Sequence, residues 1–275
     1  MTGRFSLPRV EIRQCLSCRS WSAHEKSESS ETSSQFYADI DERVYREYFE
    51  PFRSGQYRET LARLKARVPQ GASLLDVGAS YGWLVRVARD LGWNAIGIEP
   101  ARIQVEASVA EYVLQSTLDD YVTRAKHARA DVVTMWHVLE HIPDLVTTMA
   151  ELRAVCAEGG HLLIAVPNAE GRMFRLAVWL ARFGARGLLR ELFYLRNPNM
   201  HYHYFTPAGL TSLLTRCGFA VEDVFTLEAF DWRRAHMRIG RTIPRGVLRA
   251  VGPLIAASNF TGTENLVVLS RSVAA

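Results

Sequence analysis

The chain of 275 residues has few cysteines, no long uninterrupted apolar run and no internal repeat. Four cysteines do not make a disulfide framework at this length, and Cys156 and Cys217 are expected near helix ends as small buried residues. No apolar run reaches membrane-spanning length without an arginine, and the N-terminal residues lack the apolar core of a signal peptide. We therefore expect a cytoplasmic protein, and neither a secreted scaffold nor an integral membrane protein.

A serine-rich polar tract at 27–34 divides the sequence into two parts of unequal size. Its composition is that of a flexible linker. The whole chain is 48% hydrophobic, which is enough to bury a full core. We predict an N-terminal appendage over 1–55 and one large domain over 56–275, with an arginine-rich helical insertion or lid near 170–200.

The most informative stretch, residues 74–84, reads as a buried strand, a turn of small residues and a helix. Asp76 lies at the end of the strand. The turn contains Gly78, Ser80 and Gly82. Because glycine has no side chain, such a turn lets backbone N–H groups and a helix N-terminus approach a ligand closely. The G-x-G-x-x-G turn of dinucleotide-binding proteins is absent, which argues against an NAD-dependent oxidoreductase.

Strands and helices alternate through the middle of the chain. A second strand, 94–99, ends in Glu99 about twenty residues beyond the turn, where a doubly wound fold places the acid that binds ribose hydroxyls. The alternation predicts an α/β fold with a parallel sheet and helices on both of its faces. Further strands are expected at 131–135, within 159–168, at 219–225 and at 265–269.

The spacing D-x-G-x-S-x-G starts at Asp76, and further motifs follow it up to residue 168. Together they resemble the motifs of the class I S-adenosylmethionine-dependent methyltransferase family. The family's usual motif has glycine where this chain has Ser80. The resemblance is closest over residues 73–168. It implies a Rossmann-like, doubly wound sheet of seven strands, mostly parallel, with an antiparallel last strand. It also implies that S-adenosylmethionine binds at Asp76, Gly78, Ser80, Gly82, Glu99, Leu118 and Asp119.

Each of these residues has a role implied by the resemblance. Asp76 orders the turn, the two glycines of the turn lie against the methionine part of the cofactor, and Glu99 binds the ribose diol. Leu118 and Asp119 follow a short third strand and match the family's adenine contact. An equally simple interpretation makes Asp119 or Asp120 a helix N-cap.

The segment from His137 to His141 has the order H-x-x-E-H, which is also a zinc-metallopeptidase signature. That site needs a long helix, and Pro143 excludes one. The segment instead resembles the L-E-H-x-P-D element of small-molecule methyltransferases. In the related ubiquinone-biosynthesis O-methyltransferases, a glutamate three positions before the E-H pair completes a divalent-metal site, and here that position is His137. Since Mg²⁺ prefers oxygen ligands, we assign no metal ligands and expect EDTA to have little effect.

Two histidines are candidates for catalysis. His141 carries an imidazole whose ordinary pKa of about 6.5 suits proton removal near neutral pH, and the alternative is that it only fixes its loop by a hydrogen bond. His203 lies in the segment 201–205, which resembles the family's H-x-x-x-F-T element before a late helix. One side chain of this segment is expected to contact the acceptor, while most of the segment is expected to pack.

Cys15 and Cys18 form half of a zinc knuckle. Some sugar C-methyltransferases carry an N-terminal zinc site built from two such pairs. This chain has no second pair, and only His24 lies nearby. We therefore interpret the pair as a remnant that binds no metal.

Arginine is concentrated in two late segments, 172–196 and 231–249. If the first is helical, five of its arginines share an arc of about 80° beside apolar positions, which is typical of an interfacial helix. The alternative is a lid with solvated arginines. The pattern predicts peripheral contact with the inner face of a membrane through Arg172, Arg175, Arg182, Arg186 and Arg190. A comparable stripe is formed by Arg234, Arg238, Arg241, Arg245 and Arg249.

Together these motifs predict an enzyme that transfers a methyl group from S-adenosylmethionine to a small molecule. The resemblance favours an oxygen acceptor, in a sugar, a phenol or quinone precursor, or a lipid-linked glycan. The alternative is a non-catalytic cofactor-binding module at a membrane or protein surface. Nucleic-acid methylation would require an N/D-P-P-Y-type element after the fourth strand, and 136–139 is not one, so no nucleic-acid partner is expected.

Overall fold

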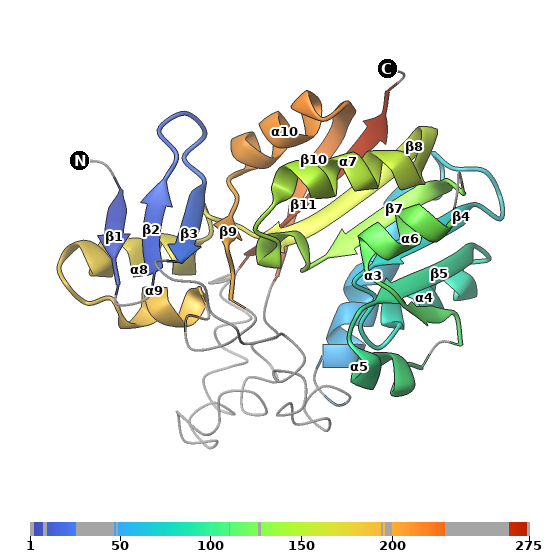
Figure 1. The fold of residues 1–275 in the computed structure, drawn as a ribbon, viewed down its shortest axis with the longest axis horizontal. Helices are drawn as coiled ribbons and strands as arrows, with labels where there is room; N and C mark the ends of the chain where they lie inside the picture. The colour runs from blue at the N-terminus through green and yellow to red at the C-terminus, as the bar shows by residue number, and fades with distance from the viewer. Residues whose placement is uncertain are drawn as a thin grey trace.

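The structure is a computed structural model that describes residues 3–7, 10–25, 47, 49–109, 111–125, 128–193, 195, 200–228 and 264–273. Within these residues the chain forms a seven-stranded sheet flanked by helices and a four-stranded sheet at one end (Figure 1). The serine-rich tract at 27–34 and the second arginine stripe at 234–249 lie outside the described residues.

The seven-stranded sheet has the order β10-β11-β8-β7-β4-β5-β6. Neighbouring strands are parallel except at β11, which runs antiparallel to both β8 and β10. This arrangement confirms the predicted Rossmann-like sheet with an antiparallel last strand. The strands are β4 (Ser73–Val77), β5 (Asn94–Glu99), β6 (Val113–Gln115), β7 (Ala130–Trp136), β8 (Cys156–Pro167), β10 (Phe219–Glu228) and β11 (Glu264–Ser272).

The order of the strands reverses between β4 and β7. From β4 the chain proceeds outward through β5 to β6, and it then returns to form β7 on the other side of β4. Open α/β sheets bind their ligands beyond the carboxyl ends of the strands at such a point. The topology therefore brings the loops 78–82 and 137–141 together at one edge of the sheet.

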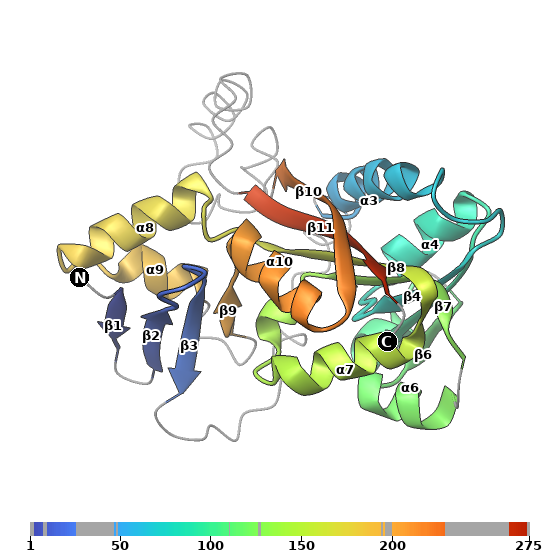
Figure 2. The same cartoon turned by 90° about the horizontal axis from the view of Figure 1, so that it is seen from above.

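Helices cover both faces of the large sheet (Figures 1 and 2). Helices α3 and α4 pack on one face, and α6, α7 and α10 pack on the other. Because the central strands are buried on both faces, their sequences are nearly continuous apolar runs. The helices are α3 (Glu50–Leu64), α4 (Trp83–Asp90), α5 (Arg102–Glu106), α6 (Leu118–Ala125), α7 (Leu145–Val155) and α10 (Pro207–Arg216).

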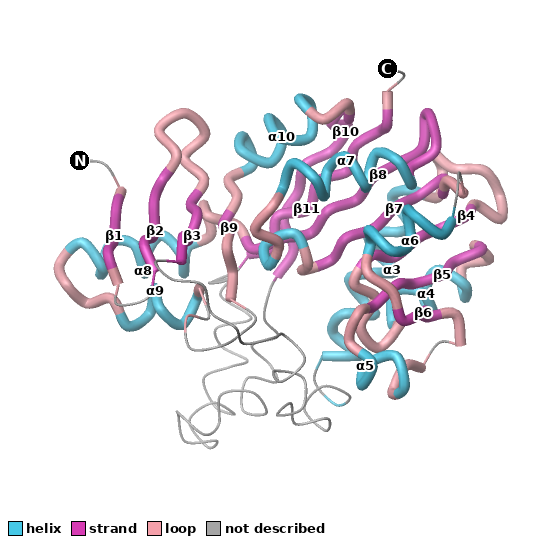
Figure 3. The backbone as a smooth tube through the Cα atoms, viewed as in Figure 1, coloured by secondary structure: helices cyan, strands magenta, loops and turns pink. Residues whose placement is uncertain are grey.

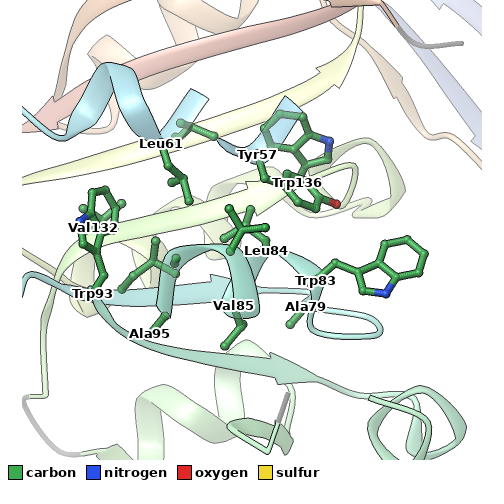
Figure 4. Packing of buried hydrophobic residues seen from close by; sticks show 14 of the residues in the cluster. Tyr57, Leu61, Ala79, Trp83, Leu84, Val85, Trp93, Ala95, Val132 and Trp136 are labelled. Atoms are coloured by element: carbon green, nitrogen blue, oxygen red, sulfur yellow. The ribbon is translucent and has the colours of Figure 1, made fainter. Parts of the chain in front are cut away.

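The core beneath α3 and α4 fixes the end of β7 (Figure 4). Tyr57 and Leu61 of α3 pack in one cluster with Val132 of β7. The Tyr57 ring meets the indole of Trp136 edge-on, with ring centroids 4.8 Å apart. Full burial of a large apolar side chain stabilises a fold by about 1.5–3 kcal/mol. These contacts hold the last residue of β7 in place, directly before the loop 137–141.

A second sheet joins the N-terminal segment to a late segment of the chain (Figure 3). Its strands are β1 (Arg4–Ser6), β2 (Val10–Gln14), β3 (Trp21–Glu25) and β9 (His203–Tyr204), paired antiparallel in that order. Helices α8 (Arg172–Arg182) and α9 (Gly187–Leu192) share a buried core with this sheet, through side chains such as Trp21, Phe174 and Phe193. The N-terminal strands and the arginine-rich helices therefore form one packed unit. The division at residue 55 stays a prediction.

The arginine-rich segment is helical, but it is not one straight helix. Helix α8 ends at Arg182, and Gly184 takes a φ of 91°, in the left-handed region that commonly ends a helix. The prediction that five arginines share one arc assumed a continuous helix. The break at Gly184 makes that assumption wrong. Arg186 directly precedes α9 and Arg190 lies within it. Helix α8 alone carries Arg172, Arg175 and Arg182.

Candidate functional site

The turn after β4 has an unusual backbone conformation. Gly78, Ser80 and Gly82 have φ angles of 74°, 49° and 74°, all in the left-handed region. A residue with a side chain rarely adopts this region, so Ser80 sits in the turn at a cost in backbone strain. Helix α4 begins directly afterwards at Trp83. Its first N–H groups have no partners within the helix and lie beside the turn, where they can bind a ligand.

The turn packs closely against the segment that follows β7. A methyl group placed on Gly78 would overlap the Cγ2 atom of Val138. The absence of a side chain at Gly78 therefore allows this close approach, in addition to the positive φ. The contact joins two sequence motifs that are far apart along the chain.

The Glu99 carboxylate holds the turn in place. Its Oε2 atom accepts a hydrogen bond from the Ser80 N–H at 3.0 Å, and its Oε1 atom accepts one from the Ala101 N–H at 2.9 Å. The side chain is buried. Burial raises the pKa of Glu99, and the two bonds from backbone N–H groups oppose the rise. Glu99 thus orders the turn, a role that the resemblance implied for Asp76.

Asp76 lies near the end of β4 and is buried. Its Oδ1 atom accepts a hydrogen bond from the Thr134 hydroxyl at 2.6 Å. Burial raises the pKa of Asp76 to about 7; the bond from Thr134 opposes the rise, and the negative charge of Glu99 adds to it. The carboxyl group therefore changes its charge near neutral pH when no ligand is bound.

Asp76→Asn is expected to change how the stability of the protein depends on pH. Because the folded pKa of about 7 lies above the unfolded value of 3.8, Asp76 favours folding fully below pH 3.8. This contribution is lost as the pH rises through about 7. Asparagine keeps the shape without the charge, so the variant should gain stability relative to the wild type as the pH rises. Thermal melts at about pH 5 and about pH 8 measure the difference, and parallel pH dependence in the two proteins would contradict it.

Leu118 and Asp119 begin helix α6 at the same edge of the sheet as Glu99. Residue 115, at the end of β6, pairs with Glu99 of β5, and α6 begins three residues later. Leu118 is half-buried and Asp119 is exposed. The Thr117 hydroxyl accepts a hydrogen bond from the Asp120 N–H at 3.1 Å. The helix is thus capped by Thr117, and the alternative of a cap at Asp119 or Asp120 is wrong.

The segment after β7 forms a single 3₁₀ turn, Leu139–His141. This confirms that the H-x-x-E-H order does not lie on the long helix of a metallopeptidase. Glu140 is fully buried, and its Oε1 atom lies 2.9 Å from Nδ1 of His137. Burial raises the pKa of Glu140 to about 8, while a hydrogen bond with its own backbone and the charge of Arg53 oppose the rise.

Histidines from two distant segments meet beside Glu140. The rings of His141 and His201 are edge to face, with centroids 4.7 Å apart. Burial, and to a lesser extent the neighbouring His141, lowers the pKa of His201 well below its ordinary value. The pKa of His203 is also lowered by burial, and hydrogen bonding with the backbone at Pro143 and Ile142 opposes the fall. His141 and His203, the two histidines predicted for catalysis, therefore both lie at the segment that follows β7.

Two contributors to the site were given no role of their own from the sequence. Gly97 of β5 lets the turn approach, because a methyl group there would lie 2.5 Å from the Cβ of Ala79. Glycine inside a strand often marks such close approach, and this signal could have identified it. His201 belongs to the segment 201–205 that the resemblance marked for contact with the acceptor, but its place beside Glu140 depends on contacts between distant segments.

Cys15 and Cys18 lie in the turn between β2 and β3 as free thiols. The Thr206 hydroxyl donates a hydrogen bond to the carbonyl of Cys18 at 2.6 Å, which ties this turn to the start of α10. Hydrogen bonds from the backbone at Cys18 and Ser17 lower the pKa of the Cys15 thiol. The ring of His24 lies 2.9 Å from the Ser22 hydroxyl. The interpretation of the pair as a remnant stays a prediction.

Comparison with known proteins identifies the domain that carries this site. Residues 48–224 match the model of a methyltransferase domain family. The ubiquinone biosynthesis O-methyltransferase of Xanthomonas axonopodis pv. citri (strain 306) is 30% identical to this chain over 197 residues. The match covers 67% of this chain and 78% of that protein.

Solved structures with low sequence identity share the fold. A protein from Galdieria sulphuraria, assigned as a sarcosine dimethylglycine methyltransferase, has a TM-score of 0.53 at 15% identity and covers 81% of this chain and 86% of its own. The cyclopropane synthase MmaA2 from Mycobacterium tuberculosis has a TM-score of 0.53 at 16% identity, with 79% and 83% covered. The structural likeness shows the fold alone, whereas the family model and the Xanthomonas relative show the family. The chain belongs to the methyltransferase domain family and is a class I S-adenosylmethionine-dependent methyltransferase.

Proposed function

We propose that this enzyme methylates a hydroxyl oxygen of a small molecule, namely a sugar, a phenol or quinone precursor, or a lipid-linked glycan. The contact between Gly78 and Val138 carries the proposal, because it sets the cofactor turn against the loop that bears Glu140 and His141. Carboxylate and imidazole groups beside the cofactor suit the binding and deprotonation of a hydroxyl group. The Xanthomonas relative is named an O-methyltransferase, which supports oxygen as the acceptor atom.

The residues on the cofactor side fit S-adenosylmethionine. Gly78 and Gly82 leave the backbone of the turn uncovered, so that the methionine part can lie against it. Each oxygen of the Glu99 carboxylate accepts one bond from the backbone and has a second lone pair, which can accept a bond from a ribose hydroxyl. We assign the adenine to Leu118 and Asp119, because they lie beyond β6 at the same edge of the sheet.

The protein's own contribution to the reaction is alignment and proton removal. The sulfonium group of the cofactor supplies an electrophilic methyl group, so the acceptor must be held in line with it and deprotonated. We propose His141 and His203 for contact with the acceptor. The Nδ1 atom of His141 lies 3.1 Å from the carbonyl of Met200. A ring that donates from Nδ1 has its basic lone pair on Nε2, which fixes the tautomer that a base requires.

A methyl-transfer screen over the three acceptor classes tests the proposal. We expect turnover with one class, and nuclear magnetic resonance of the product should place the new methyl group on oxygen. His141→Gln should lower kcat by about 10²–10⁴-fold, the usual contribution of a general base, with no change in cofactor affinity measured by calorimetry. Methylation of nitrogen or carbon alone would contradict the proposal. Equal losses of activity and thermal stability would instead assign His141 a structural role.

We further propose that α8 and α9 contact the inner face of a membrane, which places the enzyme in the cytoplasm. Leu176, Trp179 and Phe183 are 45%, 55% and 75% exposed, and the rings of the two aromatic residues lie 5.1 Å apart. Large apolar side chains beside arginines are typical of helices that lie in a membrane interface. The neighbouring basic residues are Arg172, Arg175, Arg182 and Arg186, which are exposed, and Arg190, which is half-buried. Among the described residues, none of the helices has the length and apolar character needed to cross a membrane.

Sedimentation with vesicles that contain anionic lipid is expected to show binding that weakens as salt rises. Each arginine near an anionic surface contributes about 1 kcal/mol, and salt screens this attraction. Arg182→Glu combined with Arg186→Glu should therefore reduce the bound fraction. Because Arg186 also donates a hydrogen bond to the Ser6 carbonyl at 2.9 Å, thermal melts check that the double variant is still folded. Arg124→Glu combined with Arg216→Glu is the matched control, because it makes the same change in net charge at exposed positions on α6 and α10. No sedimentation at low salt would leave α8 and α9 as a lid.

A further inference from the structure

We propose that five polar residues on the α3 side of the large sheet bind the hydroxyl groups of a sugar ring and so select the acceptor. These residues, the polar cluster, are Arg53, Gln56, Thr60, Trp136 and Asn265. Each carries a side-chain nitrogen or oxygen atom that is buried and has no hydrogen-bond partner among the described residues. An unpaired buried polar atom destabilises a fold unless a ligand or water supplies the missing bond. The inference deepens the O-methylation proposed above and rests on it.

Helix α3 buries two stripes of different character. Tyr57 and Leu61 belong to an apolar stripe that packs in the core. Arg53, Gln56 and Thr60 follow the helical spacing i, i+3 and i+7, and they form a polar stripe beside the apolar one. Gln56 and Thr60 are buried, and Arg53 is half-buried. A helix on a sheet normally turns its polar face to solvent, so a buried polar stripe indicates that this face meets a partner that forms hydrogen bonds.

Strands β7 and β11 add the other two members at the carboxyl edge of the sheet. Trp136 of β7 and Val267 of β11 both belong to the core beneath α3. Asn265 lies two residues from Val267 along β11, so its side chain points to the same face. Figure 4 shows the indole nitrogen of Trp136 on the side of its ring away from Leu61 and Val132. The free N–H therefore points away from the apolar core.

A hydrogen bond holds the polar stripe of α3 next to Asn265. The Nε2 atom of Gln56 donates to the carbonyl of Glu228 at 2.5 Å. Glu228 of β10 pairs with residue 264 of β11, which directly precedes Asn265. The bond fixes the orientation of the Gln56 amide and leaves its Oε1 atom as a buried, unpaired acceptor. The helix and the two last strands thus present their unpaired atoms at one place.

The polar cluster lies beside the loop that bears the acceptor-side groups. Trp136 is the last residue of β7 and directly precedes the loop 137–141. Burial raises the pKa of Glu140 in this loop, and the positive charge of Arg53 opposes the rise. Such an effect requires the guanidinium group to lie near the carboxyl group. An acceptor held by the polar cluster would therefore also reach the loop.

The chemistry of the unpaired atoms selects the class of acceptor. The N–H groups of Arg53 and Trp136 only donate, Oε1 of Gln56 only accepts, and the Thr60 hydroxyl and Asn265 amide do both. A sugar hydroxyl also donates and accepts, so several hydroxyls on one ring can pair with donors and acceptors alike. A carboxylate or phosphate only accepts. A phenol or quinone ring has few polar atoms and would leave most of the polar cluster unpaired. The cluster therefore fits a sugar, either free or carried by a lipid.

Binding of acceptor probes to the enzyme saturated with S-adenosylhomocysteine tests the inference. This product has no methyl group to transfer, so binding is measured without turnover. The probes are a panel of nucleoside diphosphate hexoses, a lipid-linked oligosaccharide and catechol, and calorimetry or saturation-transfer nuclear magnetic resonance detects them. We expect a sugar probe to bind, and the two kinds of sugar probe distinguish a free acceptor from a lipid-linked one. Catechol should not bind.

Binding of catechol alone would overturn the inference, as would the absence of binding by every sugar probe. A sugar that binds but is methylated on nitrogen or carbon would contradict the proposed O-methylation and leave the role of the polar cluster intact. The two failures are thus separate results.

Asn265→Leu should weaken binding of the sugar probe by about 5–150-fold, the effect of losing two hydrogen bonds. The melting temperature of the free variant should stay the same or rise, because an apolar group of similar shape replaces unpaired polar atoms. A residue with a merely structural role would show the opposite pattern, with a lower melting temperature and unchanged affinity. That pattern in Asn265→Leu would overturn the inference.

Thr60→Val is the second variant and decides the question if Asn265→Leu does not fold. It removes an unpaired buried hydroxyl, so it should weaken sugar binding without lowering the melting temperature. Thr148→Val is the matched control, because Thr148 is a buried threonine of α7 whose hydroxyl donates to the carbonyl of Asp144 at 2.8 Å. This control should lower the melting temperature and leave the sugar affinity unchanged. Wild-type affinity in Thr60→Val and in a folded Asn265→Leu would overturn the inference.

Discussion

Glu99→Ala is expected to abolish binding of S-adenosylmethionine that calorimetry can measure. The substitution removes the carboxylate proposed to accept bonds from both ribose hydroxyls. It also leaves the N–H groups of Ser80 and Ala101 without the acceptor that now holds the turn. Hydrogen bonds to a charged group contribute about 1.5–3 kcal/mol each, so the loss of two ribose bonds alone weakens binding by roughly 10²–10⁴-fold.

Glu106→Ala is the matched control for this experiment. Glu106 is an exposed acid on α5 that pairs with Arg102 at 2.6 Å, and exposed pairs of this kind contribute little to stability. The control should bind S-adenosylmethionine and S-adenosylhomocysteine with the affinity of the wild type. Wild-type affinity in Glu99→Ala would rule out the ribose role. A large drop in the melting temperature of the cofactor-free variant would show that Glu99 acts mainly on the fold.

Gly78→Ala is expected to lower the free energy of unfolding by about 2–4 kcal/mol and to impair cofactor binding. Alanine is strained at the φ of 74°, which costs about 1 kcal/mol or more. Its methyl group would also overlap Val138, and overpacking of this kind typically costs about 1–3 kcal/mol. Denaturant unfolding measures the first effect, and titration with S-adenosylmethionine measures the second.

Two further variants separate strain from overlap at this turn. Val138→Ala combined with Gly78→Ala should recover the part of the unfolding free energy that is lost through overlap with Val138. It should not recover the part that is lost through the strained backbone at residue 78. Gly55→Ala is the control, and its effect on stability should have the opposite sign. Gly55 lies within α3, and an added methyl group there would have nothing within 4 Å. There alanine should stabilise the protein by about 0.5–1 kcal/mol. A Gly78→Ala variant as stable as the wild type would contradict the close packing of the turn against Val138.

The large sheet and the cofactor side of the site could be predicted because both depend on local sequence patterns. The strands are short apolar runs with polar ends, since helices cover both faces of the sheet. Asp76, Gly78 and Glu99 lie at or directly after the ends of strands, so their positions follow once the strands are assigned. In a doubly wound sheet, the carboxyl ends of neighbouring strands meet at one edge.

The arginine-rich segment shows where a local pattern was insufficient. Its spacing indicated one helical stripe, and the segment is indeed helical. Helical periodicity does not report a break, however, and the left-handed Gly184 separates α8 from α9. Packing of both helices on the small sheet decides which apolar side chains are buried: Phe174 and Leu189 are in its core, while Phe183 is exposed.

The sequence by itself determined the α/β fold, the cofactor turn and the class of reaction, because these are encoded by residues close together along the chain. The tertiary structure alone decided which side chains meet on the acceptor side. His201 reaches Glu140 because β9 pairs with β3 and because Tyr202 bonds to the carbonyl of Glu140. Such pairings depend on the packing of the whole chain more than on the preferences of single residues. The local pattern marked the segment 201–205 for contact with the acceptor, but it could not show that His201, which precedes β9, joins the loop after β7.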